Sequence, residues 1–296
     1  MTTPSRPVQG ILWMVASGLC FVAVNAVVKH AAQDLPAAQA AFLRYLLGLV
    51  FLLPMAPALL ALRVSRREAA LFAGRGAIHT LAVMLWFYAM TRIPLAEVTA
   101  MGYLSPVYVT LGAALFLGER LSAARLGAVA AALAGAAIIL RPGFRDVDPG
   151  HLAMLGVSAF FGVSYLLAKP LSDRNPASLV VAILSVSVTL GLAPFAAAVW
   201  VAPTVAEVAW MLVVAGFATA GHYAMTLAFA AAPVSLTQPV TFLQMVWAVL
   251  LGWALFDEPP DELVILGAGV IIAAVSVIAW REARKRRGAA AAAAEP

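Results

Sequence analysis

Polar residues recur on one face of an apolar segment near residue 100. Thr99, Tyr103, Pro106 and Thr110 are spaced by four, three and four residues, which places them on one face of a helix. Because hydroxyl groups that face lipid are costly to leave unpaired, this face is expected to line an internal cavity. The alternative is ordinary helix packing, in which each threonine bonds back to its own backbone.

The second half of the chain repeats this pattern. A shift of 139 residues pairs Glu119 with Glu258, and a shift of 140 residues pairs Lys29 with Lys169. The shift projects the polar face onto Gln238, Phe242, Met245 and Val249. Two equivalent helices that present polar and aromatic groups together would form a cavity wall suited to a zwitterion with a variable side chain.

His79 lies in the middle of a long apolar run, with Arg75 one turn before it and Trp86 two turns after it. A titratable ring at mid-membrane depth is a functional candidate, whereas the alternative is a neutral imidazole bonded to a neighbouring helix. His222 and Tyr223 are weaker candidates of the same kind. Because neither histidine has a cysteine or carboxylate at ligand spacing, neither a metal nor another cofactor is expected.

Lys29 and Lys169 end two equivalent segments, where the helix dipole alone would stabilise a cation. The sharper hypothesis is a gate that latches alternately at the two membrane surfaces, with Glu119 and Glu258 as the partners. Pro106 is a hinge candidate, since an interior proline bends a helix.

Composition indicates the solvent in which these elements fold. Of the 296 residues, 64% are hydrophobic and only 11% are charged, against roughly a quarter charged in a soluble domain. The formal net charge of +5 comes from short basic clusters between apolar runs, a pattern typical of membrane topology and not of a nucleic-acid partner. The lone Cys20 excludes an internal disulfide.

Ten segments are long enough to span a bilayer, which takes roughly 20 residues. Their apolar content is continuous, which favours helices over barrel strands. The expected spans are 8–28, 38–62, 69–90, 94–117, 122–141, 150–168, 176–201, 206–230, 234–256 and 261–280. The predicted fold class is therefore an all-α integral membrane protein with ten transmembrane helices.

Basic residues predict how these spans are oriented. Alternate connections hold 13 and 4 Lys and Arg residues, which places both termini in the cytoplasm of a multi-pass protein of the bacterial inner membrane. The predicted organisation is a first five-helix repeat over 1–145, a second over 146–282, and a basic, alanine-rich tail over 283–296. Because five is odd, the second repeat is inverted, an architecture from which many secondary transporters obtain alternating access.

Residues 21–50 and 88–143 resemble the EamA-domain branch of the drug/metabolite transporter superfamily. The matching features are Lys29, Arg44, Pro106, Gly118 with Glu119, Gly127 and Gly135. The second half matches more loosely: it keeps Lys169 and Glu258, but Leu184 and Met245 replace Arg44 and Pro106. The resemblance implies ten helices around a central cavity and export of amino acids or similar metabolites, closest to the exporters of aromatic and neutral amino acids.

The predicted function is a secondary transporter or facilitator, not an enzyme, that exports aromatic or neutral amino acids by rocking one repeat against the other. The expected hydrogen-bonding residues are Asn25, His79, Tyr103, Gln238 and Gln244. The expected apolar contacts are Trp86, Phe161, Phe242 and Trp247. The expected partners are the small-molecule substrate and the lipid bilayer, with a homodimer as an open possibility.

Two alternatives remain. The cargo could be a cationic drug or a nucleoside-like metabolite. An anionic cargo would need several cations in the cavity, and only Arg75 is well placed. A lipophilic cation would need a carboxylate in the middle of the membrane, whereas Glu97 lies near a helix end. Arg44 is expected to bond helix-end carbonyls. A lipid-modifying enzyme would need a nucleophile–base pair or a metal cluster, and the sequence offers neither.

Overall fold

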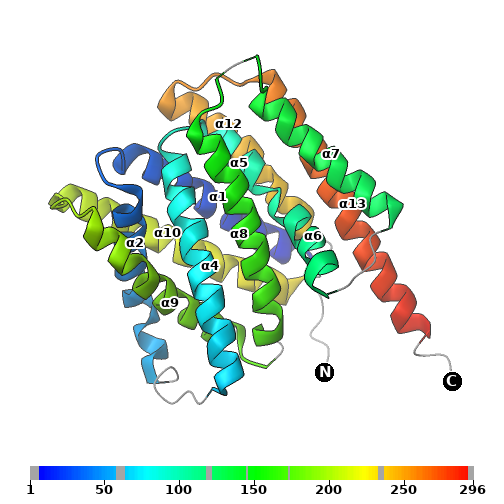
Figure 1. The fold of residues 1–296 in the computed structure, drawn as a ribbon, viewed down its shortest axis with the longest axis horizontal. Coiled ribbons are helices and arrows are strands. Elements are labelled where there is room, and N and C mark those ends of the chain that lie inside the picture. Colours follow the sequence, from blue (N-terminus) through cyan, green and yellow to red (C-terminus); the bar gives the residue numbers. More distant parts are fainter. Residues whose placement is uncertain are drawn as a thin grey trace.

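The computed structural model describes residues 7–57, 64–117, 122–144, 146–172, 174–232 and 237–292, and the regular elements within these ranges are helices (Figure 1). The first half contains α1 (Pro7–Ala31), α2 (Ala37–Gly48), η1 (Leu49–Met55), α4 (Arg66–Met90), α5 (Leu95–Gly102), α6 (Ser105–Leu117) and α7 (Ala123–Leu140). The second half contains α8 (Pro149–Ser172), α9 (Ala177–Ala198), α10 (Val205–Ala231), η2 (Gln238–Phe242), α12 (Leu243–Phe256) and α13 (Glu262–Ala292). The elements η1 and η2 are 3₁₀ helices.

Eight helices in the described part of the chain are long and apolar enough to cross a membrane. They correspond to eight of the ten predicted spans, so the all-α membrane fold is confirmed, while the full count of ten stays a prediction. The two remaining segments are also apolar and helical: 94–117 is divided into α5 and α6, and the described part of 234–256 passes directly from the 3₁₀ helix η2 into α12.

The segment 94–117 was expected to be one helix, and this expectation is wrong. The helix α5 ends at Gly102 and α6 begins at Ser105. Pro106 explains the break, because it has no N–H to donate to the carbonyl of Gly102 four residues earlier. The hydroxyl of Ser105 donates to that carbonyl instead, over 3.1 Å. Pro106 therefore stands at the start of a helix and not at an interior kink.

The segment 234–256 departs from a single regular helix at the equivalent place. The 3₁₀ helix η2, with Pro239 in its first turn, precedes α12, which begins at Leu243. In the second predicted span, α2 ends at Gly48 and continues as η1, which contains Pro54. Hydropathy predicted where these segments lie, but not how their backbone is divided.

Equivalent helices of the two halves pack in equivalent ways. The helix α1 lies against α10, and α4 lies against α8, which are the same crossing under the 139–140 residue shift. The helix starts also agree: Ser65 and Glu68 form a capping box at α4, and Thr204 and Glu207 form one at α10. In each box the two side chains satisfy backbone N–H groups that the first turn leaves unpaired.

The helices α7 and α13 lie side by side at one edge of the molecule (Figure 1). A Cβ on Gly135 would approach the carbonyl oxygen of Gly267 to 2.7 Å, so glycine permits this close crossing. By contrast, no heavy atom lies within 4 Å of a Cβ placed on Gly127 or Gly269. One pair of these glycines thus packs within the chain, and the other two leave open space.

Both ends of the described chain lie at the same end of the molecule (Figure 1). The opposite end carries the connections from α4 to α5, from α7 to α8 and from α12 to α13. Which of the two ends faces the cytoplasm stays a prediction.

Candidate functional site

The two interrupted segments meet in the middle of the molecule. Tyr103 follows the last residue of α5, and Phe242, 139 residues later, is the last residue of η2. Their rings are edge to face, with centroids 5.3 Å apart, and the Tyr103 hydroxyl donates to the carbonyl of Thr241 over 3.3 Å. Equivalent residues of two repeats can touch only near the pseudo-symmetry axis, which is where discontinuous helices of transporters bind their substrates.

A second aromatic set joins α4 to α8. The ring of Phe161 lies 4.9 Å from that of His79 and 6.2 Å from that of Trp86, centroid to centroid. The Nδ1 of His79 lies 3.0 Å from the Oγ of Ser164, so the histidine is bonded to a neighbouring helix, as the structural alternative expected. The residue as a whole is partly buried.

The residues His79, Trp86, Tyr103, Phe161 and Phe242 form what is called here the central group. All of the aromatic members but His79 pack against one hydrophobic core, as partly buried residues at its border. They therefore present ring faces that the core does not fully cover.

Two buried polar atoms lie on the α1 and α12 side of the middle. Asn25 is 8% exposed, and its Oδ1 has no hydrogen-bond partner. The indole Nε1 of Trp247 is also buried without a partner. Gln244 packs against α1, since a Cβ on Gly18 would lie 3.1 Å from its Cγ. Unpaired buried polar atoms are costly in a native protein, and a bound ligand or water is a common reason for them.

Other predicted residues are placed differently. The hydroxyls of Thr99 and Thr110 donate to the carbonyls of Leu95 and Pro106, at 2.9 and 3.0 Å, which is the packing alternative. The side chain of Gln238 lies outside the described residues.

The two candidates on α10 also separate from each other. His222 packs edge to face on Phe21, with centroids 5.0 Å apart. Tyr223, the next residue, is 66% exposed. Only His222 is therefore placed against a neighbouring helix, α1.

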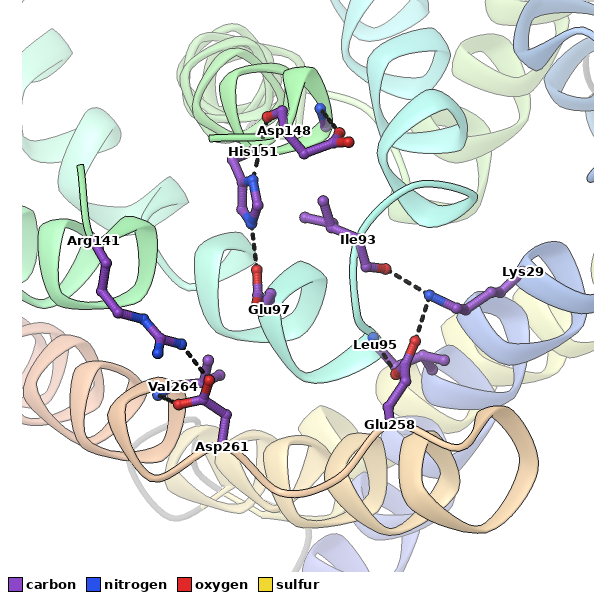
Figure 2. Close-up of polar contacts among 11 residues, drawn as sticks. Lys29, Ile93, Leu95, Glu97, Arg141, Asp148, His151, Glu258, Asp261 and Val264 are labelled. Atoms are coloured by element: carbon purple, nitrogen blue, oxygen red, sulfur yellow. Dashed lines mark hydrogen bonds and ion pairs between the residues drawn. The ribbon is translucent and has the colours of Figure 1, made fainter. Parts of the chain in front are cut away.

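One of the two predicted lysine–glutamate pairs, called here the latch, is present (Figure 2). It lies where α1 and α12 end, beside the connection from α12 to α13. The Nζ of Lys29 lies 2.5 Å from the Oε1 of Glu258 and donates to the carbonyl of Ile93 over 2.7 Å. The other carboxylate oxygen of Glu258 accepts from the backbone N–H of Leu95 over 2.9 Å. These contacts tie the end of α1 to the start of α5 and the end of α12. The equivalent partner Glu119 and the side chain of Lys169 lie outside the described residues.

Figure 2 shows two further pairs at this end that the sequence did not predict. Glu97 and His151 form a pair through Oε2 and Nε2, with side chains only 3% and 4% exposed. The Nδ1 of His151 lies 3.2 Å from the carbonyl oxygen of Asp148. Both ring nitrogens of His151 thus face oxygen atoms, one of a carboxyl group and one of a backbone carbonyl.

The second unpredicted pair joins Arg141, which follows α7, to Asp261, which precedes α13. Burial by itself raises the pKa of Asp261, but hydrogen bonds from Arg141 and from the N–H groups of Leu263 and Val264 outweigh it and hold the pKa below its usual value. These three pairs, together with their neighbours in Figure 2, are called here the polar end.

A cavity of about 320 Å³ opens at the polar end between α5, α12 and α13. Glu97, Asp257, Glu258 and Asp261 are among its lining residues. No group of three or more metal-ligating side chains occurs in the described ranges. The cavity therefore lies beside the latch and not at the central group.

Nothing in the sequence pairs Glu97 with His151 or Arg141 with Asp261, because the partners lie 54 and 120 residues apart. Only the folded topology brings these helix ends together. The Tyr103–Phe242 contact, by contrast, joins two residues that the repeat already matched.

Comparison with known proteins adds the family context. A model of the EamA-like transporter family matches residues 8–141 and 148–280, once in each half of the chain. A riboflavin transporter of Rhizobium johnstonii is 33% identical over 287 residues, which cover 96% of this chain and 95% of that protein. A pseudopaline exporter of Pseudomonas aeruginosa is 32% identical over 271 residues, covering 90% and 94%.

The fold has a counterpart of known structure. A crystal structure with 21% sequence identity covers 91% of this chain and 95% of its own, with a TM-score of 0.60. At this identity the likeness concerns the fold alone.

Proposed function

Because the chain belongs to the EamA-like transporter family, we propose that it carries small polar metabolites with a planar aromatic part across the bacterial inner membrane. Family membership confirms the resemblance carried by residues 21–50 and 88–143, and with it a membrane transporter of small metabolites. The observation that carries the proposal is the contact between Tyr103 and Phe242, since it joins the break between α5 and α6 to the equivalent transition from η2 to α12.

The central group is proposed as the substrate site. Its aromatic rings would stack on a planar cargo. The unpaired atoms of Asn25 and Trp247 would offer one acceptor and one donor to the cargo's polar edge. This combination of apolar walls and a few convergent polar groups is typical of small-molecule sites.

Movement is proposed to follow alternating access, with one repeat rocking against the other. The latch of Lys29 and Glu258 would hold the polar end together in one state. Lys169 and Glu119, their counterparts under the repeat, would close the opposite end in the other state. Pro106 would act as a hinge between α5 and α6, because the helix is already divided there.

The cargo is proposed to be of the flavin type and not an amino acid. Riboflavin and pseudopaline are the compounds in the names of the two relatives described above, and neither name supports the amino-acid export expected from the sequence. A planar ring system also suits the several aromatic side chains of the central group. Export of aromatic or neutral amino acids is therefore kept only as the second arm of the test.

The remaining organisation is proposed as the sequence predicts it. Both termini face the cytoplasm, the two repeats cover 1–145 and 146–282, and 283–296 form a cytoplasmic tail. The protein acts as a transporter without enzymatic activity or cofactor. The bilayer is its partner, and a homodimer is one possible state.

Counterflow into proteoliposomes tests this proposal. Purified protein would be reconstituted with an internal pool of riboflavin, phenylalanine, tryptophan or a nucleoside, and uptake of the same labelled compound would be followed. We expect riboflavin counterflow at least tenfold above protein-free vesicles, and little for the amino acids. Counterflow of tryptophan or phenylalanine without riboflavin would move the cargo assignment to amino acids, and no counterflow of any compound would contradict the proposal.

A further inference from the structure

The charge of Arg75 lies unpaired inside the helix bundle. Arg75 occupies α4 one turn before His79 and is only 7% exposed. Its Nε and Nη1 atoms are buried and have no hydrogen-bond partner. The guanidinium therefore does not reach solvent or lipid headgroups through these atoms, as a snorkelling arginine would.

Other basic groups surround the same region. Arg44 on α2 and His222 on α10 lie close enough to His79 to interact with it electrostatically, as does Arg75 itself. From the sequence, Arg75 is the one cation well placed for an anionic cargo, and Arg44 is expected to bond helix-end carbonyls. In the structure Arg44 instead stacks on the ring of Tyr45 at 3.9 Å, with its Nε buried and unpaired.

The carboxylates do not balance this charge. The ion pairs recorded among the described residues all lie at the polar end: Lys29 with Glu258, Arg141 with Asp261, and His151 with Glu97. Besides the basic groups, Tyr45 on α2 and Tyr165 on α8 lie within electrostatic range of Arg75. A buried guanidinium without a counter-ion is unfavourable unless a ligand supplies the negative charge.

The surroundings also indicate the rest of the ligand. Tyr165 is 50% exposed although its ring stacks on Phe161, with centroids 6.1 Å apart and planes 22° from parallel. Phe161 in turn contacts His79, one turn from Arg75. A partly exposed aromatic surface thus extends from His79, one turn from Arg75, to Tyr165, which lies within electrostatic range of the guanidinium.

We propose that Arg75 binds an anionic oxygen group, a carboxylate or a phosphate, of the transported metabolite, while Phe161 and Tyr165 pack against its aromatic part. The planar fork of guanidinium N–H groups suits both anions, and Arg44 adds to the positive field. This inference rests on the proposed transport function and names the cargo class as an aromatic anion.

Matched pairs of cargo test the inference in proteoliposomes. Riboflavin 5′-phosphate and riboflavin differ by the phosphate, and 3-phenylpropionate and its amide differ by the carboxylate charge. Wild-type protein should bind the anionic member of a pair about tenfold more tightly, read as the KM of counterflow or as quenching of tryptophan fluorescence. The pair that shows the preference identifies phosphate or carboxylate as the source of the negative charge.

Substitutions then assign the effect to Arg75. Arg75→Gln should raise the KM for the anionic member about tenfold while leaving the neutral member near wild type. Arg75→Lys, which keeps the charge, should restore part of the preference. Arg66→Gln, at an exposed position on the same helix, is the control and should change neither.

The outcomes separate the inference from the proposed function. Wild-type transport of neutral ring compounds with no preference for either anion overturns the inference and leaves the proposed function standing. An equal loss for both members of a pair in Arg75→Gln also overturns it, since that pattern indicates a structural role. Transport of no compound by wild-type protein overturns the proposed function and the inference together. If Arg75→Gln fails to fold, the inference is tested by the preference of the wild-type protein for the anionic cargo and by the part of that preference that Arg75→Lys keeps.

Discussion

The polar end and the middle of the molecule treat buried polar groups in opposite ways. At the polar end, Glu97 and His151 are almost fully buried and paired with each other, and Lys29 is held by both Glu258 and a carbonyl. In the middle, Asn25, Arg75 and Trp247 bury polar atoms that have no partner, whereas at the polar end the described residues leave only the Nε of Arg141 in this state, and the Nη2 of Arg141 is paired with Asp261. Charged groups at the polar end therefore hold helix ends together, whereas the unpaired polar atoms in the middle make no such contact within the described chain.

This contrast leads to opposite expectations for mutation. Removing one member of a satisfied buried pair leaves the other uncompensated and should destabilise the fold. Removing an unpaired atom should cost little stability, or even increase it, and should instead reduce function, as is typical of binding sites.

The largest stability effect is expected at the pair of Glu97 and His151. Glu97→Ala would leave His151 buried without its carboxylate, so the free energy of unfolding should fall by about 3–5 kcal/mol. Thermal and denaturant unfolding in detergent would measure it, with the exposed Glu262→Ala as a control of the same residue type. A loss below about 1 kcal/mol would show that the pair does not stabilise the polar end.

The latch should have a smaller effect on stability and a larger one on conformation. Lys29→Ala removes the tie from α1 to Glu258 and to the carbonyl of Ile93, at a cost of about 1–3 kcal/mol. A cysteine introduced as Ala96→Cys in a Cys20→Ser background lies in the cavity lining and should react faster with a polar maleimide when Lys29 is replaced. An unchanged labelling rate would contradict the gate, although the pair could still stabilise the fold.

In the middle, Trp247→Phe removes the unpaired Nε1 while keeping most of the ring. The melting temperature should stay the same or rise, because no hydrogen bond is lost. Transport should nevertheless fall severalfold, as counterflow would record. A clear loss of stability with normal transport would reverse the contrast between the two regions.

The smallest effect concerns Asp261, whose pKa lies below its usual value because of the hydrogen bonds from Arg141 and two backbone N–H groups. A depressed carboxyl pKa adds stability above the pKa of the unfolded state, about 3.9, and that stability is lost as the pH falls through the folded value. Asp261→Asn should therefore lower stability at neutral pH by less than about 1 kcal/mol, since the pair is partly exposed. The difference from wild type should vanish at low pH.

The contrast also explains what the sequence could and could not predict. Long apolar runs such as Pro7–Ala31 were found because hydropathy depends only on composition along one segment. At Pro106 the sequence predicted a bend within one helix, but it did not predict that α5 would end at Gly102 and α6 begin at Ser105, because hydropathy is equally apolar on both sides of the missing backbone N–H.

Some contacts between distant residues could be predicted from the sequence and others could not. Tyr103 and Phe242 could be related through the repeat, and the structure brings them into contact. Glu97 and His151 could not, because no periodicity links two residues on different helix ends. For the same reason the sequence did not predict the positive electrostatic environment of His79, to which Arg44 and His222 contribute from other helices.

The most direct test of the central claim uses the symmetry of the site. Riboflavin counterflow would be compared in one series for wild type, Tyr103→Ala, Phe242→Ala and Phe195→Ala, the last an exposed aromatic residue on α9. If cargo binds where the interrupted helices meet, Tyr103→Ala and Phe242→Ala should each lower the rate about tenfold or more, and Phe195→Ala should leave it near wild type. Wild-type rates in both Tyr103→Ala and Phe242→Ala would place the transport path elsewhere and contradict the account.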